Sequence, residues 1–106
     1  MSLFKTILGW MTSGPDRISV DEGRKRVEAG ATLVDVRSAA EFASGHLPHA
    51  LNIPIGDLGE RVSEIPKGGP VVLYCFSGAR SRRGAAYLRA AGYDAGDMGP
   101  MPSRWR

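Results

Sequence analysis

The chain has 106 residues, of which 42% are hydrophobic and 24% charged, and its formal net charge at pH 7 is +3. This length supports one domain with its own core and excludes a second, and the single cysteine excludes an intramolecular disulfide. Two histidines without a further thiol argue against a structural zinc site, so we expect no metal and no cofactor. The arginines are spread along the chain, which favours steering of small anions over binding of nucleic acid.

The N-terminal stretch, residues 1–17, is predicted to be an apolar segment followed by a linker. Its apolar residues fall at helical spacing, which favours packing on the domain and leaves contact with a membrane surface or a partner as the alternative. No stretch is long enough for an integral membrane segment, and the start lacks a charged lead-in and a small-residue cleavage site. We therefore expect a cytoplasmic protein whose domain occupies residues 18–106.

Predicted helices and strands alternate along this domain. We expect helices over 19–29, 38–45, 57–65 and 81–91, and strands over 32–36, 50–53, 71–75 and 95–98. Ser19 with Glu22 and Ser38 with Glu41 have the spacing of capping boxes, and residues 99–102 are expected to be irregular because they contain two prolines. The alternation predicts an α/β fold, a small parallel sheet flanked by helices on both faces.

The strongest functional signal is residues 71–81, an apolar strand followed by the only cysteine and a glycine-bearing turn that arginine closes. Cys75 should end the strand, at the sheet edge where ligands bind in α/β folds. The backbone N–H groups of the turn and a helix starting at Ser81 favour an anion there, and Arg80 adds a planar cation suited to an oxyanion. A lone cysteine after an apolar strand is usually a small buried hydrophobe. Here Gly78, which permits close approach, favours a thiolate nucleophile.

Two further stretches complete a pattern. Residues 35–37 are an Asp-x-Arg sequence at a predicted strand end, and residues 41–54 begin with Glu-aromatic-x-x-Gly-His-apolar. Together with the loop from Cys75 to Ser81, and in this order and spacing, they resemble rhodanese domains, the fold of single-domain sulfurtransferases. The resemblance extends over residues 18–105.

The resemblance implies a ping-pong transfer of sulfur through a persulfide on Cys75. A small anionic donor such as thiosulfate gives its sulfane sulfur to the cysteine, and cyanide, a thiol or a thioredoxin-like protein accepts it. The terminal sulfur of a persulfide is anionic and needs converging N–H donors, which the loop backbone can supply. Cys75 and Arg80 are the expected catalytic residues, with Arg80 holding the oxyanion end of the donor. The other loop positions are expected to bind the substrate: Phe76, Ser77, Gly78, Ala79 and Ser81.

Several neighbouring residues have structural rather than chemical interpretations. Asp35 and Arg37 are expected to support the site by orienting and ion-pairing. His46 is expected in a structural turn, because persulfide chemistry needs no general base once the thiolate exists. Glu41 is interpreted as a helix cap, and Arg82-Arg83 as solvated helix charges.

Three other functions are alternatives to sulfur transfer. A phosphatase or arsenate reductase would resemble Cys-(x)5-Arg, whereas Cys75 to Arg80 is Cys-(x)4-Arg, and the shorter loop favours sulfur. A non-catalytic binding module would not need the cysteine. A persulfide carrier for a protein partner fits the same residues. His49 stands where the family commonly has glycine, and Gly99-Pro100 stands where it has a glycine pair. Because of these two differences, the resemblance does not decide the shape of the loop that closes the site or the identity of the acceptor.

Overall fold

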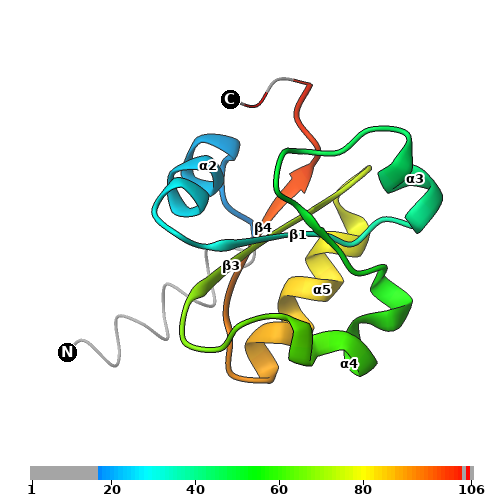
Figure 1. The fold of residues 1–106 in the computed structure, drawn as a ribbon. Coiled ribbons are helices and arrows are strands. Elements are labelled where there is room, and N and C mark those ends of the chain that lie inside the picture. The colour runs from blue at the N-terminus through cyan, green and yellow to red at the C-terminus, as the bar shows by residue number, and fades with distance from the viewer. Residues whose placement is uncertain (1–16, 104, 106) are drawn as a thin grey trace.

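The computed structural model describes residues 17–103 and 105, and these residues fold around a four-stranded sheet (Figure 1). The strands are β1 (Thr32–Asp35), β2 (Leu51–Asn52), β3 (Pro70–Cys75) and β4 (Asp94–Pro100). Their order is β2-β1-β3-β4, and all neighbours pair in parallel. All four carboxyl ends therefore lie at the same edge of the sheet. The apolar segment predicted before Arg17 lies outside the described residues.

Helices cover both faces of this sheet. They are α2 (Val20–Glu28), α3 (Ala39–Ala43), α4 (Leu58–Arg61) and α5 (Ala79–Ala90), with 3-10 turns η1 (Ile55–Asp57) and η2 (Val62–Glu64) on either side of α4. α4 and α5 pack on one face and α2 on the other. The predicted α/β class, a small parallel sheet between helices, is confirmed. Within the described part of the chain, none of these helices has the length and apolar content needed to cross a membrane.

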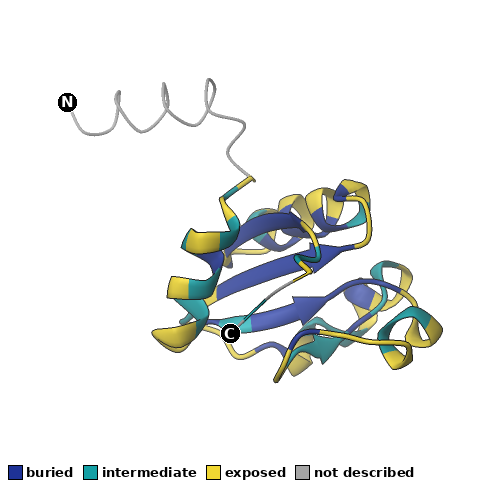
Figure 2. Cartoon of the chain, turned by 90° about the horizontal axis from the view of Figure 1, so that it is seen from above, coloured by how far each residue is buried: buried dark blue, intermediate teal, exposed yellow. Residues whose placement is uncertain are grey.

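The core has one part on each face of the sheet, because side chains of the central strand β3 alternate between the two faces. Val71, Leu73 and Cys75 pack with α4 and α5, whereas Val72 and Tyr74 pack on the side of α2. All five are fully buried, and Figure 2 shows the buried strands between helices whose outer surfaces are exposed. Cys75 therefore ends a strand that is covered on both faces.

The last strand is longer than predicted. The prediction that residues 99–102 are irregular is wrong at Gly99 and Pro100, which extend β4. β4 is at the edge of the sheet, where a proline does not interrupt a hydrogen-bond ladder on its outer side. Gly99 has a φ of +82° and its N–H donates to Oδ1 of Asp97 at 2.7 Å, next to a register shift in the ladder with β3. Pro100 consequently pairs with Cys75 and lies beside the cysteine.

Two helices also differ from the prediction in their limits. α5 begins at Ala79, two residues before the predicted start, because Gly78 turns the chain sharply with a φ of +100° and is the N-cap. The helix predicted over 57–65 is a four-residue helix between two 3-10 turns. The capping box of Ser38 and Glu41 is present in full at the start of α3.

Candidate functional site

The sulfur of Cys75 lies at the carboxyl end of β3, where the chain turns into α5. Its side chain has no exposed surface. The backbone N–H groups of Gly78 and Ser81 donate to Sγ at 3.0 and 3.3 Å, and the Ser81 hydroxyl lies 3.4 Å from Sγ. Three polar groups of one short loop thus converge on the only thiol of the chain.

These contacts favour the thiolate form of Cys75. Burial by itself raises the pKa of the thiol, but the Ser81 hydroxyl and the N–H groups of Ser81, Gly78 and Arg80 lower the pKa by more. The net result is a pKa below that of an ordinary cysteine. Since the thiolate is the attacking species, the loop favours the nucleophilic form of this residue.

The loop that carries these donors is held from two sides. The carbonyl of Gly78 accepts a hydrogen bond from the Ser81 hydroxyl at 3.2 Å and one from Nη2 of Arg17 at 3.4 Å. A Cβ at Gly78 would lie 3.1 Å from Arg17 Nη2 and 3.4 Å from Cδ of Pro100, so only glycine fits without a shift of its neighbours. Close packing on this residue fixes the direction in which its N–H points.

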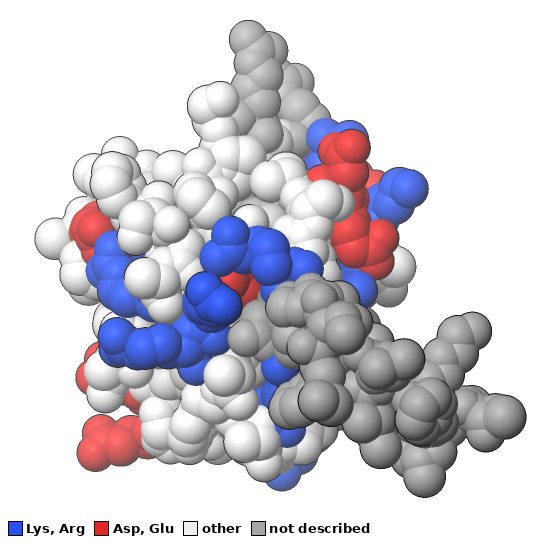
Figure 3. Space-filling view, turned by 180° about the vertical axis from the view of Figure 1, so that it is seen from behind, with Lys and Arg blue, Asp and Glu red and all other residues white. Residues whose placement is uncertain are grey.

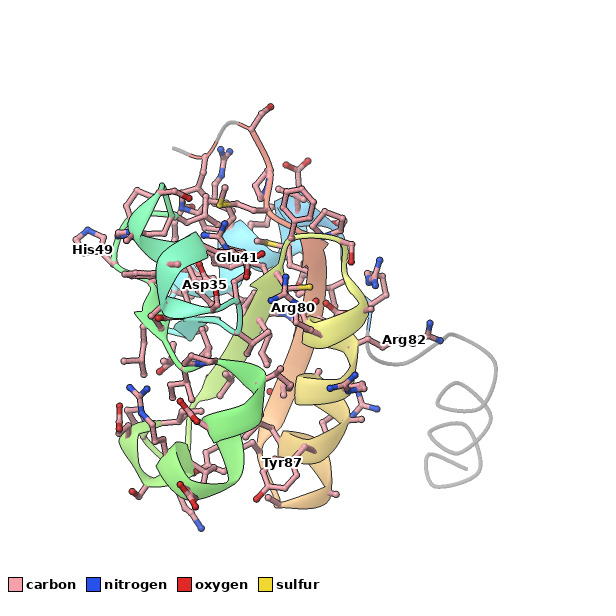
Figure 4. All side chains as sticks on the ribbon, turned by 90° about the vertical axis from the view of Figure 1, so that its right-hand side faces the viewer. Asp35, Glu41, His49, Arg80, Arg82 and Tyr87 are labelled. Atoms are coloured by element: carbon pink, nitrogen blue, oxygen red, sulfur yellow. The ribbon has the colours of Figure 1, made fainter. Side chains whose placement is uncertain are left out.

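Arg80 pairs with an acidic residue from another helix. Its Nη1 lies 2.7 Å from Oε1 of Glu41, and its Nη2 lies 3.0 Å from Oε2, a bidentate pair between α5 and α3. Figure 4 shows the two labelled side chains pointing toward one another. Chiefly because of the Arg80 guanidinium, the pKa of Glu41 is lowered to about 2, so the carboxylate is ionised at neutral pH.

Glu41 therefore does more than the sequence predicted. It completes the capping box of α3, with Oε1 accepting from the Ser38 N–H at 2.8 Å, and it also holds Arg80. The two members of the pair are 39 residues apart, and neither position has a local pattern that points to the other.

Asp35 and Arg37 form a second, buried pair at the end of β1. Arg37 Nη2 lies 2.7 Å from Asp35 Oδ2, and the same nitrogen donates to the carbonyl of Gly45 at 2.7 Å. The guanidinium also lies 5.7 Å from the centre of the Tyr74 ring. This pair ties the end of β1 to the turn that contains Gly45.

Sequence reasoning missed a third pair, Arg17 with Asp97. Nε of Arg17 lies 3.0 Å from Oδ2 of Asp97, which is fully buried on β4. These residues are 80 positions apart in the chain. Because Arg17 also donates to Gly78, the pair connects the start of the domain to the cysteine loop.

The two histidines lie away from the sulfur contacts. His46 stacks on Phe42 with the ring centres 3.6 Å apart, and its Nδ1 lies 2.9 Å from the Phe42 carbonyl oxygen, which fits the predicted structural turn. His49 is exposed and has a φ of +65°, so it adopts the left-handed conformation that glycine takes most easily. Figure 4 shows His49 at the outer side of the molecule.

The other loop residues face solvent. Phe76 is 70% exposed, the highest exposure of a large apolar side chain in the described part of the chain. Ser77 and Ala79 are exposed as well. Arg82 is exposed and points away from the pair of Arg80 and Glu41 (Figure 4). Seen from behind, Lys and Arg side chains form a band across the middle of the surface (Figure 3).

Comparisons with known proteins agree with this geometry. The chain matches the family model described as rhodanese-like domain over residues 19–97, which include the cysteine loop. It is 52% identical over 61 residues to a sulfurtransferase of Allochromatium vinosum, a stretch that covers 58% of this chain and 57% of that protein. It is 32% identical to the thiosulfate sulfurtransferase GlpE of Pseudomonas savastanoi pv. phaseolicola, covering 73% of both chains. In two further curated relatives the matched stretch spans 28% and 49% of their length.

Solved structures show the same likeness. The human single-domain sulfurtransferase TSTD1 superposes with a TM-score of 0.68 at 31% identity, covering 76% of this chain and 86% of the human one. CoADR-RHD of Bacillus anthracis gives a TM-score of 0.74 at 27% identity, covering 88% of this chain but 17% of the larger protein.

Proposed function

Because the chain belongs to the rhodanese-like domain family, we propose that it is a sulfurtransferase that carries sulfane sulfur as a persulfide on Cys75. The observation that best supports this proposal is the convergence of the Gly78 and Ser81 N–H groups on the Cys75 sulfur, at 3.0 and 3.3 Å. Such donors stabilise negative charge on sulfur in a site from which water is excluded.

The reaction has two steps that share the same cysteine. In the first, the Cys75 thiolate attacks the sulfane sulfur of the donor; the new S–S bond forms as the donor's own bond breaks. With thiosulfate, sulfite leaves with the electron pair. In the second step an acceptor, such as cyanide or a thiol, attacks the outer sulfur and the Cys75 thiolate is regenerated. Neither step needs an added oxidant or reductant.

The roles of the remaining residues follow from their positions. Gly78 and Ser81 stabilise the charge on sulfur, while Asp35 and Arg37 hold the adjacent end of β1 in place. Phe76, Ser77 and Ala79 are the exposed loop positions that a donor or acceptor would meet first. Arg80 contributes positive charge beside the loop, although both of its terminal nitrogens are held by a carboxylate.

Intact-mass analysis tests the proposal. The protein should gain one sulfur atom when treated with thiosulfate or with an organic persulfide, and cyanide should remove it. Cys75→Ser should show neither adduct nor turnover, because a serine hydroxyl is not ionised near neutral pH. Hydrolysis of an aryl phosphate should be negligible. Phosphatase turnover by the parent protein, with no sulfur taken up from any donor, would overturn the assignment.

A further inference from the structure

The arginines that contact the cysteine loop or the adjoining strand end are already matched by acids. Within the described residues there are three of them: Arg80 pairs with Glu41, Arg37 with Asp35, and Arg17 with Asp97. The exposed side chain of Arg82 points away from the pair of Arg80 and Glu41 (Figure 4). Asp35 and Asp97 have no exposed side-chain surface, whereas the Glu41 side chain is 36% exposed. Glu41 is therefore the one carboxylate of the three that an approaching donor can meet.

This arrangement disfavours a donor with two negative charges. A sulfonate group such as that of thiosulfate is best bound by the fork of a free guanidinium. In this protein Nη1 and Nη2 of Arg80 donate to the two Glu41 oxygens at 2.7 and 3.0 Å, so the charge of the guanidinium is already compensated by a carboxylate. A sulfonate that displaces these contacts, or that binds the remaining N–H groups of Arg80, comes to lie next to the ionised carboxylate of Glu41. Like charges placed together in this way lower affinity.

The loop instead offers an apolar contact. Phe76 directly follows Cys75 in the chain, and 70% of its surface is exposed. An organic persulfide, R–S–SH, has a carbon stem that can lie on such a ring and has no sulfonate. Its sulfane sulfur needs only the N–H donors of Gly78 and Ser81, which are unaffected by the pairing of Arg80.

We propose that Glu41 is a specificity-determining residue that directs Cys75 toward organic persulfides and away from thiosulfate. This inference rests on the proposed sulfur transfer. In the transfer, the Cys75 thiolate attacks the outer sulfur of R–S–SH, and the bond between the two donor sulfurs breaks. The thiolate R–S⁻ leaves with the electron pair, and the transferred sulfur keeps its proton, which it then releases to water.

The test compares two donors on matched variants. Single-turnover uptake of sulfur by Cys75 is measured by intact mass, with thiosulfate and with benzyl persulfide. Glu41→Gln should raise the rate with thiosulfate at least about threefold, since it removes one charge from a partly exposed pair, and should leave the rate with benzyl persulfide within about twofold. Arg80→Gln should lower the rate with thiosulfate. Glu64→Gln, which breaks a similar surface pair between Glu64 in η2 and Arg61 in α4, is the control and should change neither rate.

Glu41→Gln keeps a side-chain oxygen that can accept from the Ser38 N–H, so α3 should retain its cap; a melting curve checks this. If that variant does not fold, Phe76→Ala decides. It should lower the rate with benzyl persulfide by about threefold or more and spare thiosulfate, because the apolar contact is lost. Tyr87→Ala is its control, since Tyr87 is exposed at the far end of α5 (Figure 4).

The outcomes separate this inference from the function on which it rests. If no donor places sulfur on Cys75, the sulfurtransferase proposal itself is wrong. If sulfur is taken up but Glu41→Gln changes both donors equally, or neither, the specificity role of Glu41 is overturned while the transfer stands. If Phe76→Ala, used in its place, leaves the two rates in their original ratio, the preference of the loop for organic persulfides is overturned.

Discussion

Replacing Ser81 with alanine would show how much a single hydroxyl contributes to the state of the Cys75 sulfur. In the thiol form Sγ donates to the Ser81 hydroxyl oxygen at 3.4 Å, while the hydroxyl donates to the Gly78 carbonyl at 3.2 Å, and both side chains are fully buried. Once the thiol is ionised, the hydroxyl can turn and donate to Sγ. A hydrogen bond to a charged group contributes about 1.5–3 kcal/mol, and the length of this one places it at the lower end. A loss of about 1.5 kcal/mol corresponds to roughly a tenfold drop in the ratio of thiolate to thiol at a fixed pH. The pKa of Cys75 should therefore rise in Ser81→Ala.

The assay is the ultraviolet absorbance of the thiolate followed across pH, with Cys75→Ser as the blank. The midpoint of the titration should move to higher pH in Ser81→Ala, while the absorbance at high pH stays the same. Ser77→Ala removes an exposed hydroxyl from the same loop and should leave the midpoint where it is. A midpoint that does not move in Ser81→Ala would refute the reasoning, because the backbone N–H groups would then account for the whole effect.

Three further predictions concern stability. Arg37→Ala should lower the free energy of unfolding in urea by roughly 3–5 kcal/mol, because it leaves the buried carboxylate of Asp35 without its partner; a change below about 1 kcal/mol would contradict this. Gly84→Ala should cost about 1–3 kcal/mol, measured by thermal unfolding, since the new Cβ would lie 2.9 Å from Cδ2 of Leu73. The pKa of Glu41 is lowered from 4.5 to about 2, so its pairing stabilises the fold above pH 4.5 and this contribution is lost as the pH falls toward 2. The difference in melting temperature between the parent and Glu41→Gln should shrink over that interval, and a constant difference would argue against the pair.

Features encoded by local sequence were predictable. The alternation of strands and helices depends on short apolar runs, caps and glycines, and it led to the correct fold class. Ser38 and Glu41 have the spacing of a capping box, and the structure shows both of its hydrogen bonds. The position of Cys75 at a strand end followed in the same way, since an apolar run and a turn glycine are visible without any tertiary information.

Features that depend on distant parts of the chain were not predictable from one sequence. Glu41 looked like a cap because its cap partner is three residues away, while Arg80 is 39 residues away. Arg17 and Asp97 are 80 residues apart and carry no motif. The prolines predict that residues 99–102 are irregular, but whether a proline can extend a strand depends on whether that strand lies at the edge of the sheet.

The groups that converge on the sulfur belong largely to the main chain. Substitutions of the exposed loop side chains therefore leave these groups in place. The N–H groups of Gly78 and Ser81 are present whatever side chains stand at the exposed positions 76, 77 and 79. A library that randomises those three positions should therefore retain the nucleophile in most of its members while it varies the surface that a donor or acceptor meets. Selection for a new acceptor can then proceed without rebuilding the reactive centre.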